Sequence, residues 1–367
     1  MIFLIFFLAS FALSLILTPF IRWIAIKFNI LDRPETSKRK IHSKAIPLMG
    51  GVAIFLSFFI VLLVAKYFSL LPGLVPSNKN LIGIIVAASL LMIGGFLDDK
   101  YHLSPIQQFI WPVLACLAII ISGIGITFIN NPFGPGYLHF DTIKIEILRL
   151  NGVPYYFTPL SDILTFLWLL LLMYSTKLLD GLDGLVSGIT VIGALSIAAL
   201  CLFTQFYQPD VAAMALILAG AFSGFLVFNF HPAKIFLGEG GSLLAGFFLG
   251  VLAIISGSKF ATTFLILGLA ILDLISVIFQ RFFEKHHSIF SSDKKHLHFR
   301  LLEAGFSHRS AVIFYWSIAL VFGVVSLFLR TQGKIIALLV LIVFGSFLIN
   351  FLSHKKENPS AQQNTDL

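Results

Sequence analysis

The stretch Asp180-Gly181-Leu182-Asp183-Gly184-Leu185 lies between two apolar runs of membrane length, 162–179 and 186–206. It places two carboxylates at a membrane boundary, where ionised groups are costly and usually functional. Their i, i+3 spacing puts both on one face of a helix, and the flanking glycines let a phosphate or a backbone come close. A Mg²⁺ ion held between the acids would attract a diphosphate. The stretch therefore indicates an enzyme that handles a phosphorylated substrate at a membrane surface.

The composition agrees with a membrane protein. The chain has 367 residues, of which 58% are hydrophobic and 40 are Phe, and its mean hydropathy is +0.98. No soluble domain of this size needs so much apolar surface, so we expect one polytopic membrane domain rather than several soluble ones. The net charge of +8 follows the loops between the apolar runs, which excludes a nucleic-acid-binding surface.

Apolar runs of about 20 residues predict about ten or eleven spanning helices. The predicted spans are 2–22, 50–71, 80–97, 106–128, 160–179, 186–206, 211–230, 240–257, 260–280, 311–329 and 334–353. The expected fold class is therefore an all-α polytopic integral membrane protein. We expect one transmembrane domain over 1–353 and a polar cytoplasmic tail over 354–367. Asp273 interrupts one span, and pairing with a cation such as Arg281 would explain it.

The orientation follows from the basic residues. Most of the 25 Lys and Arg residues fall on loops of one predicted side, which the positive-inside rule makes cytoplasmic and which puts the N-terminus outside. One loop on the outer side alternates apolar and charged residues over 143–147 and is followed by Asn151-Gly152. Alternation next to an Asn-Gly turn predicts a small extracytoplasmic β-hairpin with a structural role.

The chemically active residues gather on the predicted cytoplasmic side. They are Asp98, Asp99, Asp180, Asp183, Glu239, His296, His298, Arg300 and His42. Taken singly, each group has a structural explanation, such as a solvated helix end, or an acid that favours a helix dipole. Their joint position on one side favours function. Acids at three separate places suit Mg²⁺, or Mn²⁺, better than zinc, and the histidines suit phosphate contact or acid–base work.

Four motifs occur in a fixed order: Asp98-Asp99, Asp180 to Leu185, Gly238-Glu239-Gly240-Gly241-Ser242-Leu243, and the run 296–305, His-Leu-His-Phe-Arg-Leu-Leu-Glu-Ala-Gly. With these motifs, the chain resembles the polyprenyl-phosphate N-acetylhexosamine-1-phosphate transferases of glycosyltransferase family 4. This family includes the undecaprenyl-phosphate GlcNAc-1-phosphate transferases and phospho-N-acetylmuramoyl-pentapeptide transferase. The resemblance implies transfer of a sugar-1-phosphate from a UDP-sugar to undecaprenyl phosphate, with release of UMP, for a cell-envelope polysaccharide.

The resemblance also implies roles for the residues. Asp98 and Asp99 match the acidic pair, one of which would be the base at the lipid phosphate. His296 and His298 match the histidine motif that contacts the phosphates. Asp180 and Glu239 are the expected Mg²⁺ ligands. The residues expected to bind the nucleotide sugar are Lys177, Asp183, Arg300 and His42.

The chain departs from the family pattern at a few positions. Tyr174 and Lys177 stand where the family usually has Asn, and Gln107-Gln108 occupies a region where a Lys often follows the acidic pair. Glu239 replaces an Asp. These changes indicate a divergent branch, because each acidic position keeps a carboxylate.

Two alternatives stay open. The first is the muramoyl-pentapeptide transferase, which has the same chemistry with a peptide-bearing donor. The second belongs to another class, a membrane transporter, which would place its acids near the bilayer midplane. The partners expected for the leading hypothesis are undecaprenyl phosphate, a UDP-sugar, the bilayer of a bacterial plasma membrane and a second copy in a homodimer.

Overall fold

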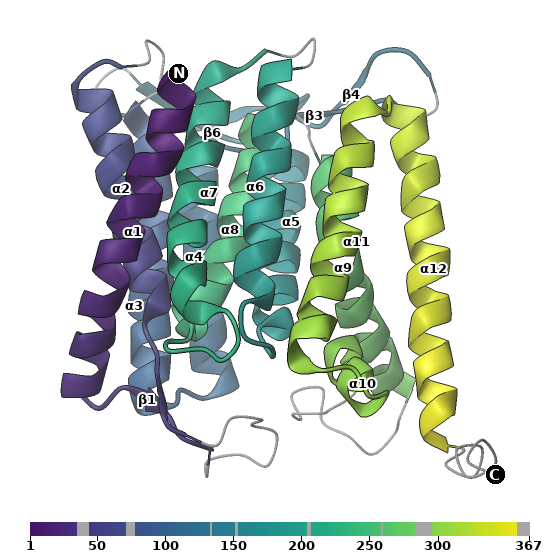
Figure 1. Ribbon diagram of the computed structural model, residues 1–367. Helices are drawn as coiled ribbons and strands as arrows, with labels where there is room; N and C mark the ends of the chain where they lie inside the picture. The colour runs from purple at the N-terminus through teal and green to yellow at the C-terminus, as the bar shows by residue number, and fades with distance from the viewer. Residues whose placement is uncertain are drawn as a thin grey trace, which may run out of the picture.

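The computed structural model describes residues 1–34, 44–70, 78–132, 134–150, 153–203, 207–257, 260–283 and 296–357. The helices are α1 (Ile2–Lys27), α2 (Gly50–Tyr67), α3 (Asn78–Tyr101), α4 (Pro105–Ile121), α5 (Pro159–Leu179), α6 (Leu185–Phe203), α7 (Pro209–Asn229), α8 (Gly238–Ile255), α9 (Phe260–Phe283), α10 (Leu297–Glu303), α11 (His308–Phe328) and α12 (Thr331–Glu357). They run roughly side by side in one bundle (Figure 1).

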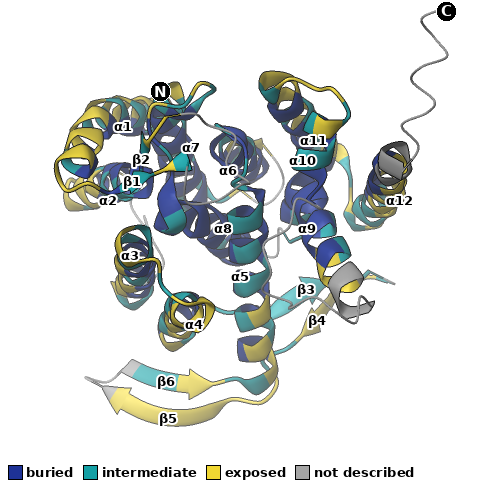
Figure 2. Ribbon diagram, turned by 90° about the horizontal axis from the view of Figure 1, so that it is seen from below, coloured by how far each residue is buried: buried dark blue, intermediate teal, exposed yellow. Residues whose placement is uncertain are grey.

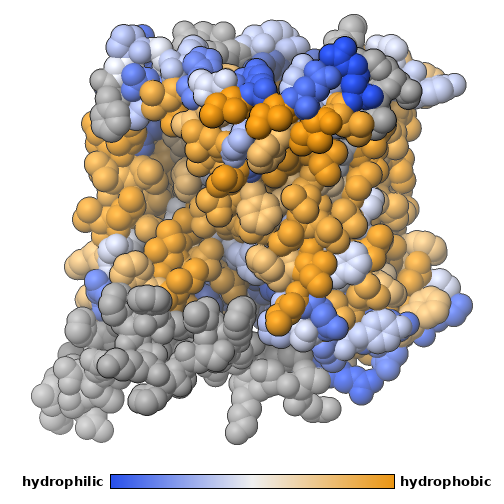
Figure 3. Space-filling view, turned by 180° about the vertical axis from the view of Figure 1, so that it is seen from behind, coloured by the Kyte–Doolittle hydropathy of each residue, from blue (hydrophilic) through white to orange (hydrophobic). Residues whose placement is uncertain are grey.

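The predicted polytopic membrane fold is confirmed. In the described part of the chain, 10 helices are long and apolar enough to cross a membrane. The predicted span 106–128 corresponds to α4, an apolar helix of 17 residues that ends at Ile121, before the predicted end of that span. α1 begins and α12 finishes at opposite ends of the bundle (Figure 1). On the face seen in Figure 3, a broad apolar belt lies between polar residues at the upper and lower ends. The chain is a multi-pass membrane protein.

Helix α8 forms the centre of the bundle. Every residue from Gly240 to Ile254 is buried, as expected for a helix that is apolar all round. It contacts α2, α3, α5, α6, α7 and α9, and seen along the helix axes it is enclosed by them (Figure 2). Helices α9, α11 and α12 pack together beside this core, joined to it by α5 and α6. The N-terminus of α8 is therefore held at the middle of one end of the molecule.

The predicted hairpin is present at the opposite end. Strand β5 (Ile145–Leu150) pairs antiparallel with β6 (Val153–Phe157), with a register shift between Glu146 and Leu148. A second small sheet that we did not predict pairs β3 (Phe128–Asn130) with β4 (Tyr137–His139). β3, β4 and β6 lie at the upper end of Figure 1, and β1 and α10 at the lower end. The hairpins are thus remote from the acidic motifs.

A close approach of two helices brings those motifs together. Gly95 of α3 lies against Gly240 of α8 so closely that a Cβ on Gly95 would be 2.1 Å from the Gly240 nitrogen. No side chain fits between them, so the end of α3 meets the start of α8 directly. β1 (Leu31–Asp32) pairs with β2 (Ile46–Pro47), and the N–H of Phe236, just before α8, donates to the Pro47 carbonyl at 2.8 Å.

Candidate active site

A cavity of about 720 Å³ opens at the end of the bundle where α3 and α5 finish and α8 begins. The carboxylates that line it are Asp32, Asp98, Asp99, Asp180, Asp183 and Glu239. The histidines that line it are His102, His231, His296, His298 and His308. Lys177 also lines it. Acids from four separate parts of the sequence therefore share one polar chamber at a bundle end.

The structure brings nearly all predicted site residues into this cavity. Two predicted residues stand apart. His42 lies outside the described residues. Arg300 does not line the cavity: its Nη1 donates to the Ile349 carbonyl at 3.1 Å, which joins α10 to α12. This contact gives Arg300 a structural function, and its binding of the nucleotide sugar stays a prediction.

The acidic pair at the end of α3 is held by backbone and side-chain donors. Asp98 Oδ1 accepts hydrogen bonds from the Leu103 N–H at 3.0 Å and from Gln108 Nε2 at 2.9 Å. Asp99 Oδ1 accepts from the Glu239 N–H at 3.0 Å. The Asp99 bond lies at the N-terminus of α8, where a negative charge is favoured by the helix dipole. Asp99 thus joins α3 to α8, and Asp98 organises the turn that follows α3.

Asp180 is the acid best suited to hold a cation. It caps the C-terminus of α5, and burial, with the charges of Glu239 and Asp183, raises the pKa of its carboxyl to about 8. Within the described residues, its carboxylate makes no hydrogen bond or ion pair. A divalent cation would replace the missing partner, and hard carboxylate oxygens are the ligands that Mg²⁺ prefers. The donor set therefore fits a Mg²⁺ ion.

Glu239, the other predicted Mg²⁺ ligand, has a partner in the protein. Its Oε1 forms an ion pair with Lys177 Nζ. The ammonium also donates to Gln108 Oε1 at 3.0 Å. Glu239 is therefore already paired with an internal cation, and its role as a Mg²⁺ ligand stays a prediction.

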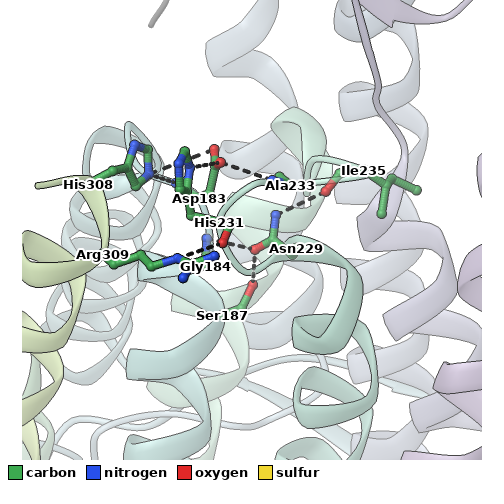
Figure 4. Close-up of polar contacts among 9 residues, drawn as sticks. All are labelled: Asp183, Gly184, Ser187, Asn229, His231, Ala233, Ile235, His308 and Arg309. Carbon is green, nitrogen blue, oxygen red and sulfur yellow. Dashed lines mark hydrogen bonds and ion pairs between the residues drawn. The ribbon is translucent and has the colours of Figure 1, made fainter. Parts of the chain in front are cut away.

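Asp183 forms a hydrogen-bond network with two histidines (Figure 4). Its Oδ2 lies 2.7 Å from His231 Nδ1 and accepts from the Ala233 N–H at 3.1 Å. Its own N–H donates to His308 Nε2 at 2.8 Å, and the two imidazoles stack with their centroids 4.1 Å apart. Ligand atoms of Asp183, His231 and His308 lie within 4.8 Å of one another, a spacing that could hold a metal ion. Because His308 Nε2 already accepts the Asp183 N–H, we interpret the three as a positioning network.

Asn229 fixes the turn that carries the second acidic motif (Figure 4). Its Oδ1 accepts from the Gly184 N–H at 3.1 Å and from Ser187 Oγ at 2.8 Å, and its Nδ2 donates to the Ile235 carbonyl at 3.1 Å. All these groups are buried, so each needs its partner. The turn after α5 and the loop before α8 are therefore one hydrogen-bonded unit.

The two predicted histidines differ in environment. His296 Nδ1 lies 2.9 Å from Asp273 Oδ2, and Asp273 Oδ1 accepts from the Leu297 N–H at 2.8 Å. We expected Asp273 to pair with a cation such as Arg281, whose side chain lies outside the described residues. In the structure, Asp273 holds His296 at the start of α10.

His298 is buried completely. Among the described residues neither of its ring nitrogens has a hydrogen-bond partner. Burial lowers its pKa to about 4, so the imidazole is neutral near pH 7. A Cβ on Gly181 would be 2.2 Å from His298 Nε2, so only glycine allows this histidine to approach the acidic turn. An unpartnered imidazole on a cavity wall is suited to contact a ligand.

The sequence interpretation missed Asp32, His102, His231 and His308, which also line the cavity. Their position in the sequence could have identified them, because all of them fall in loops or at helix ends on the predicted cytoplasmic side. The same-side argument that selected the other residues applies to these as well.

Comparison with known proteins supports the predicted resemblance to the sugar-phosphate transferases. The profile of glycosyl transferase family 4 matches residues 81–257. A probable undecaprenyl-phosphate N-acetylglucosaminyl 1-phosphate transferase of Bacillus subtilis is 32% identical, over 93% of this chain and 89% of that protein. A decaprenyl-phosphate N-acetylglucosaminephosphotransferase of Mycolicibacterium smegmatis is 28% identical, over 94% and 87%. A phospho-N-acetylmuramoyl-pentapeptide-transferase of Bacillus subtilis is 30% identical, over 88% and 95%. The chain belongs to glycosyl transferase family 4.

Proposed function

We propose that this protein transfers GlcNAc-1-phosphate from UDP-GlcNAc to undecaprenyl phosphate at the cytoplasmic face of a bacterial plasma membrane, with release of UMP. The observation that carries the proposal is the convergence of Asp98, Asp99, Asp180, Asp183 and Glu239 on one cavity at a bundle end. The relatives whose names specify a GlcNAc-phosphate transfer support the choice of sugar. A transporter is disfavoured, because these acids lie at helix ends and not at mid-membrane depth.

In the proposed reaction, a phosphate oxygen of the lipid attacks the β-phosphorus of the UDP-sugar, and the bond from that phosphorus to the oxygen bridging to UMP breaks. Both reactants are anions, so the protein must position them and offset their charge. A bound Mg²⁺ would supply that neutralisation, with Asp180 and Glu239 as its ligands. Asp98 and Asp99 would orient the lipid phosphate and take up its proton where it carries one.

The remaining lining residues would complete the substrate site. His298, neutral and without a partner among the described residues, would donate a hydrogen bond to a phosphate oxygen. His296, held through its Nδ1 by Asp273, would present Nε2 to the substrates as a hydrogen-bond acceptor. The network around Asp183 would keep the acidic turn rigid while the nucleotide binds.

The test is UMP release by detergent-purified protein supplied with undecaprenyl phosphate, Mg²⁺ and one UDP-sugar at a time. We expect release with UDP-GlcNAc and its loss in Asp180→Asn and in EDTA. Asp210→Asn, which removes a carboxylate at the start of α7, is the matched control and should keep the wild-type rate. Release with UDP-MurNAc-pentapeptide alone would identify the muramoyl branch. No release with any donor, or full activity in Asp180→Asn, would contradict the proposal.

A further inference from the structure

We infer that Gln108 and Lys177 form a functional pair, in which Gln108 is a positioning residue that holds the Lys177 ammonium where it binds the diphosphate of the substrate. The inference rests on the proposed function and names a part of its substrate site. Both positions depart from the family pattern, and in the structure they meet: Lys177 Nζ donates to Gln108 Oε1 at 3.0 Å across α5 and α4.

The charge of the cavity gives Lys177 its importance. The wall carries several carboxylates, and of the described lysines and arginines, Lys177 alone lines it. Two other cations near the motifs point elsewhere: Lys100 lies over the Phe96 and Tyr101 rings, and Arg300 bonds the Ile349 carbonyl. A diphosphate that enters the cavity is repelled by the acids, and among the described lysines and arginines the Lys177 ammonium is the one placed to attract it.

The ammonium is held in place from three sides. It forms an ion pair with Glu239, donates to Gln108, and lies 5.5 Å from the centroid of the Tyr174 ring. Its side chain is 19% exposed, enough for an incoming phosphate to reach it. These contacts already restrict the Lys177 side chain, so less conformational entropy is lost when a phosphate binds it.

The contacts of Gln108 determine which way its amide faces. Its Nε2 lies 2.9 Å from Asp98 Oδ1 and 3.1 Å from the Leu103 carbonyl, which are both acceptors. The Oε1 atom must therefore face the ammonium, because turning the amide over would set a donor against a donor. Gln108 thus couples the acidic pair after α3 to the cation on α5.

Binding of the diphosphate depends on the place of the positive charge and not on the helix that carries it. Helices α4 and α5 pack against each other, and the two side chains reach the same point from opposite sides. An exchange, Gln108→Lys with Lys177→Gln, should return an ammonium and an amide to the same neighbourhood. Lys177→Gln alone removes the charge, and Gln108→Lys alone sets two ammonium groups against each other.

The experiment is a double-mutant cycle on the full-length protein in detergent, with UMP release and the melting temperature measured for each variant. We expect Lys177→Gln to raise the KM for the nucleotide sugar by about tenfold or more, since it removes a charge-assisted contact. The exchanged double variant should recover most of that loss. Lys100→Gln removes an exposed lysine beside the acidic pair and is the matched control, with an unchanged KM.

The outcomes separate this inference from the proposed function. If the wild type releases UMP and the double variant is no better than Lys177→Gln, the inference is overturned. A wild-type KM in Lys177→Gln overturns it as well. If the wild type releases no UMP with any donor, the proposed function fails and the substrate role of Lys177 fails with it. Even then, the melting temperatures test the contact itself. If the double variant loses less in melting temperature than the two single variants lose together, the Gln108–Lys177 pair is supported.

Discussion

Replacing Asp273 by Asn tests the positioning of His296 most directly. Asp273 accepts one hydrogen bond from the His296 ring, at 2.9 Å, and one from the Leu297 N–H, at 2.8 Å, and all three groups are buried. Asparagine supplies a single oxygen. If that oxygen keeps the Leu297 N–H, the NH₂ group faces His296 Nδ1, which loses its acceptor unless the ring moves its proton to Nε2. The substitution therefore changes the position or the tautomer of His296, or the start of α10.

The structure sets the size of the expected effect. An unsatisfied buried donor costs about 1–3 kcal/mol. If the whole cost falls on the active position of His296, kcat/KM drops by about 5- to 150-fold, since 1.36 kcal/mol corresponds to about a factor of ten. If part of this free-energy cost destabilises the fold, the melting temperature drops as well. Measuring kcat/KM and the melting temperature together shows how the cost is divided between catalysis and stability.

The assay is UMP release with the donor that the wild type accepts, together with thermal unfolding in detergent. His296→Gln and the double variant with Asp273→Asn complete a cycle. Because Asp273 acts through His296, the double variant should be no worse than His296→Gln alone. An unchanged kcat/KM in Asp273→Asn, or strictly additive losses in the double variant, would refute the reasoning.

Three further predictions concern the packing and the charge of the site. Asn229→Ala leaves buried donors without their acceptor, so we expect the free energy of unfolding to fall by about 1–3 kcal/mol, measured by thermal unfolding. Gly95→Leu places a side chain where even a Cβ would be 2.1 Å from the Gly240 nitrogen, so the yield of monodisperse protein in size-exclusion chromatography should collapse. Mg²⁺ should raise the melting temperature of the wild type, because it binds the folded state, and should raise that of Asp180→Asn by less. Gly134→Ala, whose Cβ would have 3.6 Å to its nearest neighbour, is the control for the glycine substitution. A normal yield of Gly95→Leu, a wild-type melting temperature of Asn229→Ala, or an equal Mg²⁺ shift in Asp180→Asn would contradict the respective argument.

The membrane fold was predictable because its signal is local. Apolar runs of spanning length reveal themselves in any window of the sequence, and alternation over 143–147 before Asn151-Gly152 was enough to predict the β5–β6 hairpin. The span that differed most was 106–128. Its last part leaves the helix after Ile121 and leads into β3. Gly123, with φ +83°, and Gly125 mark this end, but the apolar residues between and after them made the run look continuous.

The candidate site was predictable as a set of residues but not as an arrangement. Asp98, Asp180 and Glu239 were selected because each follows or begins an apolar run on one predicted side, and the structure places them on one cavity. The partner of each acid was not predictable. Whether Lys177 meets Glu239, or His296 meets Asp273, depends on which helices become neighbours, and residues on different helices carry no mutual signal in a single sequence.

The sequence by itself determined that this protein is a bundle of membrane-spanning helices with an acidic, histidine-containing end, because hydrophobic periodicity and charge placement are properties of consecutive residues. Only the tertiary structure decided that Gln108 holds Lys177, that Asp273 holds His296, and that Asp180 is left without a partner among the described residues. The physical reason is packing. The contact of Gly95 with Gly240 and the central burial of α8 set which side chains meet, and burial then sets which charges must be paired.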